Sequence, residues 1–180
     1  MKEELKSFAS SKDIGIEGAY YISTKDKENH KKVFLKDVID VNKNTWKQGK
    51  NIIISLVGCQ NLASYEGLVE KKIETNVTPT VGNHQQHVVN IWLGYVGDND
   101  SDNWTRASGE ASTLNTGKIL QDSTGNKRVS ERTSIDSQYK YSMADKRAYC
   151  RAVLKHLRLF GVYSAVEAQA FNKDKDNLDF

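Results

Sequence analysis

The sequence predicts an α+β fold in which an antiparallel three-stranded β-meander packs on a long basic helix. Apolar and polar residues alternate with period two in two successive segments, from Ile73 and over 88–96, a third strand-like segment follows at 104–111, and a helical period begins at Ser142. The length of 180 residues suits one domain with a single core. We therefore expect one domain over residues 1–172, with its core at about 63–166, and a short acidic tail at 173–180.

The first 60 residues have the least regular pattern, and extra strand and helix elements are expected there. Segments 19–23 and 51–57 have the aromatic and β-branched content of strands, whereas 31–42 fits either a helix or a strand. Ser64 is a candidate N-cap for a short helix, whose apolar residues recur at helical spacing: Tyr65, Leu68 and Val69. Gly67 should keep this helix brief.

The three strands of the meander follow one another along the chain. The first contains Ile73, Thr75 and Val77 and leads into a turn-rich segment with the single proline, Pro79. The second, 88–96, places four side chains on one face: Val89, Ile91, Leu93 and Tyr95. The third, 104–111, follows a polar turn. The long polar connection 112–138 carries further cations: Lys118, Lys127, Arg128 and Arg132.

Residues 142–161 are the clearest helix, with Ser142 as its candidate N-cap and Gly161 as its terminator. At 100° per residue, one arc of about 140° forms a core face. It contains Tyr149, Phe160, Val153, Leu157, Cys150, Met143 and Leu154. An adjacent arc of about 80° holds four cations, which are Arg147, Arg151, Lys155 and Arg158. Ala144 and Ala148 beside them would let another backbone approach closely.

The charge is concentrated around this helix. The net charge of +3 divides into −1 for residues 1–117, +6 for 118–160 and −2 for 161–180. The helix cations form a row of one sign about 16 Å long, which suits a row of phosphates, although a solvated helix face is the ordinary explanation of a charge run. Aromatic residues nearby can stack bases. The candidate DNA-binding residues are Arg147, Arg151, Lys155, Arg158, Lys146, Lys127, Arg128, Arg132, Arg106, Tyr139, Tyr141 and Trp92.

Composition excludes several classes of protein. The longest apolar run, within 51–57, is far shorter than the roughly 20 residues of a membrane span, and no signal peptide is recognised, so a cytoplasmic protein is expected. Cys59 and Cys150 do not make a disulfide framework and are expected to remain thiols.

No motif for catalysis, metal or nucleotide binding stands out. His84 and His87 lack the further ligands that a metal site needs. Asp98, Asp100 and Asp102 resemble the start of a calcium loop, but Asn103 stands where that loop needs glycine. The Gly117-Lys118 pair lacks the earlier glycine of a phosphate-binding loop. We therefore expect no cofactor, no metal and no catalytic residue.

The order of three strands and a long basic helix closing with LRLFG at 157–161 resembles the single-strand annealing protein superfamily, which includes phage Erf-like recombination proteins and eukaryotic Rad-fifty-two-like annealers. Segments YEGLV at 65–69, GEAS at 109–112 and MADKRA at 143–148 look like phage members, and the resemblance covers about residues 63–166. By their position before Phe160 and Gly161, Lys155 and Arg158 match the family's helix-borne backbone contacts. Arg147 and Arg151 come from the helical wheel alone.

The resemblance implies ATP-independent binding of single-stranded DNA and annealing of complementary strands in phage-type recombination, in the cytoplasm of a bacterial host. It also implies a homo-oligomeric ring or filament, with a phage exonuclease or a host single-strand-binding protein as candidate partners. Two alternatives stay open. A duplex DNA- or RNA-binding regulatory module would prefer duplex, and a nuclease would use Asp98, Asp100 and Asp102 as metal ligands.

Overall fold

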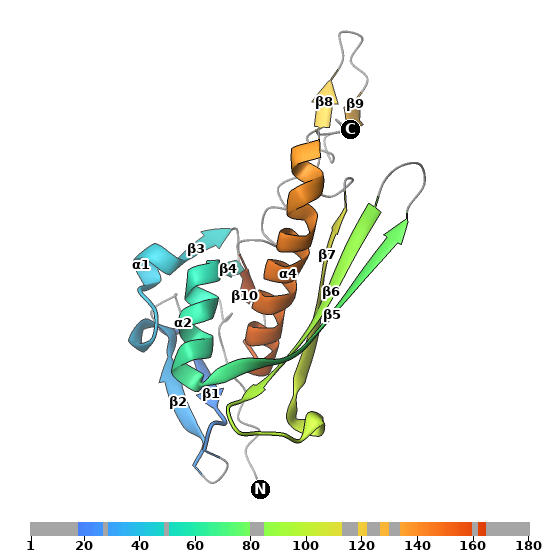
Figure 1. Ribbon diagram of the computed structural model, residues 1–180. Helices are drawn as coiled ribbons and strands as arrows, with labels where there is room; N and C mark the ends of the chain where they lie inside the picture. The colour runs from blue at the N-terminus through green and yellow to red at the C-terminus, as the bar shows by residue number, and fades with distance from the viewer. Residues whose placement is uncertain are drawn as a thin grey trace, which may run out of the picture.

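A long helix lies between a three-stranded antiparallel sheet and a layer of N-terminal elements (Figure 1). This computed structural model describes residues 18–26, 29–48, 51–79, 85–112, 119–121, 127–129, 134–159 and 162–164. The core spans both sides of the helix, because buried side chains come from the N-terminal layer, from the sheet and from the helix itself. The predicted α+β class, with an antiparallel three-stranded sheet packed on the helix, is confirmed.

The N-terminal layer starts with a hairpin. Strand β1 (Tyr20–Ser23) pairs antiparallel with β2 (Lys31–Phe34), so the strand predicted at 19–23 is confirmed. The segment that fitted either helix or strand contains both, because β2 is followed by the 3-10 turn η2 (Leu35–Asp37) and the short helix α1 (Val41–Asn44). The Asp40 side chain caps α1 by accepting hydrogen bonds from two backbone N–H groups.

A second small sheet and helix α2 complete this layer. Strand β4 (Asn51–Ile54) lies between β3 (Thr45–Gln48), which is antiparallel to it, and β10 (Val162–Ser164), which is parallel. The strand predicted at 51–57 is therefore correct only as far as Ile54. Ser55 ends it, because its Oγ accepts a 3.0 Å hydrogen bond from Gly58 N and caps helix α2 (Leu56–Glu66).

The short helix predicted to start at Ser64 is wrong. Ser64 lies in the last turn of α2, and Gly67 ends that helix with a φ of 74°, a conformation that glycine adopts without strain. Leu68 and Val69, which were assigned to the helix, begin the first strand of the meander.

The meander consists of β5 (Leu68–Pro79), β6 (Gln85–Tyr95) and β7 (Thr105–Ser112), in the order β5-β6-β7 and antiparallel throughout, as predicted. Its register places Ile73 opposite Ile91 and Ile91 opposite Ala107. The predicted apolar face of β6 is confirmed by the complete burial of three side chains: Val89, Ile91 and Leu93.

Helix α4 (Ser134–His156) is longer at its start than predicted, so Ser142 is an internal residue and not the N-cap. At its other end, Arg158 adopts a φ of 53° and ends the helix three residues before the predicted terminator, Gly161, which lies outside the described residues. Two backbone bonds close this end in a Schellman motif, from Leu159 N to Leu154 O at 2.9 Å and from Arg158 N to Lys155 O at 3.1 Å.

The sheet approaches α4 very closely at one point. A Cβ atom added to Gly109 would lie 2.0 Å from Ala144 O and 2.3 Å from Ala148 N, and both alanines are fully buried. The expectation that these alanines admit another backbone is thus confirmed, and that backbone is β7. On the other side of α4, four residues of the predicted core face are buried, namely Cys150, Val153, Leu154 and Leu157, whereas Met143 and Tyr149 are half-buried and Phe160 lies outside the described residues.

The connection between the sheet and α4 contains a second hairpin. Strands β8 (Ile119–Gln121) and β9 (Lys127–Val129) pair antiparallel, and Figure 1 places them beyond the N-terminal end of α4. Within the described part of the chain, no helix combines the length and the apolar character of a membrane span.

Candidate nucleic-acid interface

Three cations of α4 hydrogen-bond to backbone carbonyl groups of β7, one of the two edge strands of the sheet. The bonds run from Arg147 Nη1 to Glu110 O, from Arg151 Nη1 to Ser108 O (2.8 Å) and from Lys155 Nζ to Arg106 O (3.0 Å). The spacing of the cations along α4 matches the spacing of the carbonyl groups along β7, because four helix residues rise about 6.0 Å and two strand residues about 6.8 Å. Each helix turn therefore brings the next cation to the next outward carbonyl of β7.

Exposure of the helix cations increases toward the end of α4. Arg147 is only 4% exposed, Arg151 is half-buried, and Lys155 and Arg158 are exposed. The predicted stripe of four surface cations therefore needs correction, because Arg147 is an internal residue that packs against β7. Arg151, Lys155, Arg158 and the neighbouring Arg106 form the surface set, which we call the β7 edge row.

Arg106 connects the edge row with the face of the sheet that points away from α4. Its guanidinium lies 5.0 Å from the Trp92 ring and donates a 3.2 Å hydrogen bond to Asn90 Oδ1. Lys72 Nζ lies 4.9 Å from the same ring, so Trp92 contacts a cation on each neighbouring strand. Asn90 is only 5% exposed and also accepts from Ser108 Oγ, which fixes Arg106 in place.

A hollow of about 550 Å³ lies at the end of α4, where the edge row finishes. Its lining includes two cations, Lys155 and Arg158, and one acidic residue, Asp98, together with His30, Thr105, Tyr95 and His156. His156 Nδ1 shares a 2.9 Å hydrogen bond with Thr105 Oγ1, and its ring packs edge-on against Tyr95 at 5.0 Å. Burial lowers the pKa of His156, and Arg158 acts in the same direction while Glu66 opposes it. The imidazole is therefore neutral near pH 7 and contributes shape and hydrogen bonding to the hollow.

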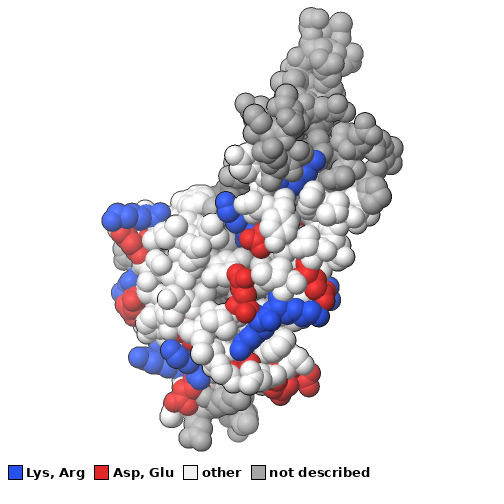
Figure 2. Space-filling model, in the orientation of Figure 1, with Lys and Arg blue, Asp and Glu red and all other residues white. Residues whose placement is uncertain are grey.

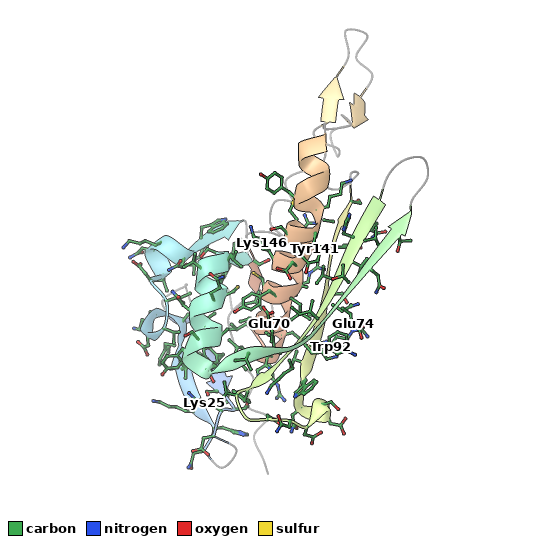
Figure 3. The ribbon with its side chains drawn as sticks, viewed as in Figure 1. Lys25, Glu70, Glu74, Trp92, Tyr141 and Lys146 are labelled. Atoms are coloured by element: carbon green, nitrogen blue, oxygen red, sulfur yellow. The ribbon has the colours of Figure 1, made fainter. Side chains whose placement is uncertain are left out.

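Several predicted site residues lie away from this row. Tyr139 and Tyr141 are exposed, but Tyr141 precedes Arg151 by about 15 Å along α4. Lys146 is exposed and points about 100° away from Arg147. Figure 3 shows Tyr141 and Lys146 on α4 and Trp92 on the sheet. Lys127 and Arg128 belong to β9, and their side chains, like all of Arg132, lie outside the described residues.

Charges of both signs share the face seen in Figure 2. Glu70, labelled in Figure 3, lies between α2 and α4, and its pKa is raised by burial and by Asp145. The pKa of Asp145 is also raised by burial, an effect that Lys146 opposes. Acidic and basic side chains are therefore mixed on this face.

The three aspartates considered as metal ligands fold a turn. Asp98 Oδ1 accepts from Asp100 N at 3.1 Å and from Asn103 Nδ2 at 3.3 Å, and Asp100 Oδ1 accepts from Asp102 N at 3.1 Å. Within the part of the chain that the structure describes, no three His, Cys, Asp or Glu side chains gather as they would around a metal ion.

Sequence reasoning missed Lys72, His30 and Thr105. Lys72 could have been predicted from strand pairing, because the register of the meander places it opposite Trp92, and Trp92 opposite Arg106. His30 and Thr105 meet the end of α4 only through the tertiary fold, so no local pattern indicates them.

Comparison with protein-family models, curated proteins and solved structures found no match. The chain has three antiparallel strands and, after the β8–β9 hairpin, the long helix α4. The β7 edge row and its surroundings are therefore the basis for a proposed function.

Proposed function

We propose that this protein binds single-stranded DNA through the phosphate backbone along the β7 edge row and anneals complementary strands without ATP. The observation that carries the proposal is the anchoring of Arg151 and Lys155 on successive carbonyl groups of β7, with Arg106 and Arg158 beside them. Cations held at a regular spacing of about 6 to 7 Å suit the repeated charges of a nucleic-acid strand.

The hydrogen bonds to the β7 carbonyl groups orient the cations and leave further N–H donors of Lys155 for a phosphate. The Lys155 ammonium has three donors, and the bond to Arg106 O uses one of them. A side chain that is already fixed loses less conformational entropy when a phosphate binds. Contacts of this kind read no base, so affinity should tolerate any sequence and fall with salt.

Trp92 supports the same proposal. Its ring lies beside Arg106, on the sheet face next to the edge row, where a base could stack. Held by its phosphates and by stacking, a strand keeps the pairing edges of its bases accessible, which annealing requires.

The packing of helix α4 supports a single-strand site over a duplex site read by this helix. A helix that reads duplex DNA must enter the major groove with one side exposed. Helix α4 has β7 against Ala144 and Ala148, and Val153 and Leu157 are buried on its other side. It is therefore a core helix over the length that carries the cations.

Annealing of two complementary oligonucleotides, one with a fluorophore and one with a quencher, tests the proposal without ATP. The wild type should accelerate quenching, and the triple variant Arg151→Ala, Lys155→Ala, Arg158→Ala should lose most of this acceleration. The variant Lys43→Ala, Lys47→Ala removes exposed cations from α1 and β3, outside the interface, and should anneal normally. No acceleration by the wild type, or full acceleration by the triple variant, would contradict the proposal.

Assembly belongs to the same proposal. The resemblance implies a homo-oligomeric ring or filament, with a phage exonuclease or a host single-strand-binding protein as partner in the cytoplasm. Mass photometry with and without a single strand tests assembly. A protein that stays monomeric in both conditions would remove the ring or filament from the proposal.

A further inference from the structure

We infer that the bound strand continues past the β7 edge row onto the N-terminal β1–β2 hairpin, where Lys25 and Lys31 bind further phosphates. This inference rests on the proposed function. It assigns a binding role to a part of the chain outside the meander and α4.

The hairpin forms one wall of a second hollow, of about 790 Å³. Its lining includes Lys25, His30, Lys31, Lys32, Tyr65 and Glu66. Glu66 is only 1% exposed, and each of its carboxylate oxygens already accepts a hydrogen bond, from Tyr21 at 2.7 Å and from Ser23 at 2.6 Å. The exposed charged residues of the hairpin that line this hollow are therefore Lys25, Lys31 and Lys32, with Asp26 beside Lys25 in the turn.

The two hollows share His30, which lines both of them. Lys155 and Arg158 line the first hollow, and Lys25 and Lys31 line the second. Cations from the two ends of the sequence thus follow one another over adjoining concave surfaces. A strand that leaves the β7 edge row at Arg158 meets this second set next.

The lysines of the second hollow differ in what holds them. Lys25 Nζ lies 3.5 Å from Tyr65 O at the end of α2, where backbone carbonyl groups favour a cation. Figure 3 shows Lys25 at this end of α2. Lys32 Nζ instead lies 3.9 Å from the Tyr20 ring, and its charge is directed to that aromatic face. Lys25 and Lys31 are thus the residues assigned to phosphates.

Tyr65 adds an aromatic surface to the second hollow. Its side chain is 48% exposed. Beside two lysines, an exposed ring provides a stacking platform for a base, as in other sequence-tolerant single-strand sites.

Salt dependence separates this second set from the first. For single strands, each neutralised phosphate contributes about 0.7 to the slope of log K against log salt. The variant Lys25→Ala, Lys31→Ala should therefore reduce the magnitude of the slope by about 1.4 for a long labelled single strand. It should still bind, because the β7 edge row remains. Anisotropy titrations of the full chain at several salt concentrations measure both quantities.

Two comparisons make the test specific. The variant Lys43→Ala, Lys47→Ala removes the same charge from outside both hollows and should keep the wild-type slope. The variant Lys25→Arg, Lys31→Arg keeps the charge and should also keep the slope. When the strand is shortened stepwise, the difference between the Ala variant and the wild type should disappear, because a short strand occupies the edge row alone.

The outcomes distinguish the inference from the proposed function. If the wild type binds single strands but Lys25→Ala, Lys31→Ala behaves like the Lys43, Lys47 control, the strand does not reach the hairpin and the inference is overturned, while the edge row stands. If the wild type binds no single strand, the proposed function fails and the inference fails with it.

Discussion

Lys155 Nζ donates a 3.0 Å hydrogen bond to the backbone carbonyl oxygen of Arg106, and so joins helix α4 to the edge strand β7. The same relationship repeats one turn earlier between Arg151 and Ser108. An edge strand with unpaired carbonyl groups can pair with other chains, and these cations cover that edge. The basic row thus has a structural role in addition to the proposed binding role, and the two roles call for separate tests.

Arg147→Ala should act on stability and not on the salt dependence of DNA binding. The side chain is 4% exposed and donates to Glu110 O, so its loss removes a part-buried hydrogen bond and leaves the carbonyl without that donor. We expect a loss of about 1 to 3 kcal/mol in the free energy of unfolding, measured by urea denaturation. An unchanged midpoint together with a smaller salt slope would instead place Arg147 among the phosphate contacts.

Gly109→Ala should disrupt the contact between β7 and α4. The added methyl would lie 2.0 Å from Ala144 O, which is backbone and can yield only if the helix moves. A loss of about 3 kcal/mol or more is expected in urea denaturation. Gly97→Ala is the control, because its φ of 82° is unfavourable for alanine but its added methyl meets no atom within 4 Å. That change should cost about 1 to 2 kcal/mol. Equal losses in the two variants would argue against the close approach.

His156 should make stability depend on pH. Burial is the main cause that lowers its pKa from the ordinary value of 6.5. As the pH falls through about 6.5, the unfolded chain takes up a proton that the folded protein resists, so the free energy of unfolding decreases. Urea midpoints at about pH 7.5 and pH 5.5 should differ more for the wild type than for His156→Gln. An identical pH response in the two proteins would remove His156 as a cause.

Trp92→Ala should weaken single-strand binding by about 1 to 3 kcal/mol for every sequence tested, because a stacking platform has no base preference. Trp92→Phe should restore part of this loss. Anisotropy titration against several oligonucleotide sequences is the measurement. If Trp92→Ala leaves affinity unchanged, the indole serves only to hold Lys72 and Arg106.

Local patterns predicted the meander and the helix but not their contact. The alternation at Val89, Ile91 and Leu93 correctly predicted the strand, because these side chains lie on the buried face of β6. The start of α4 was misplaced because residues 134–141 are largely polar, so their helical character has no apolar period to show it. Likewise, the β-branched run at 52–54 led to a strand prediction that continued past Ser55, although Ser55 is the N-cap of α2.

The candidate site was predictable only as a set of residues. The helical wheel grouped Arg147, Arg151 and Lys155 correctly, because their common direction depends on local geometry alone. Which of these cations remain exposed depends on how helix α4 is aligned along strand β7. That alignment is set by the tertiary fold and not by the local sequence. For the same reason, the sequence could not predict that His30 and Arg158 line the same hollow.

The salt dependence of single-strand binding tests the central claim most directly. With Arg106, Arg151, Lys155 and Arg158 each neutralising one phosphate, log K should fall against log salt with a slope of at least about 2.8 in magnitude. Lys155→Ala, Arg158→Ala should reduce that magnitude by about 1.4 with only a small decrease in the urea midpoint, because both side chains are exposed. A wild-type slope near zero, or an unchanged slope in the variant, would contradict binding along the β7 edge row.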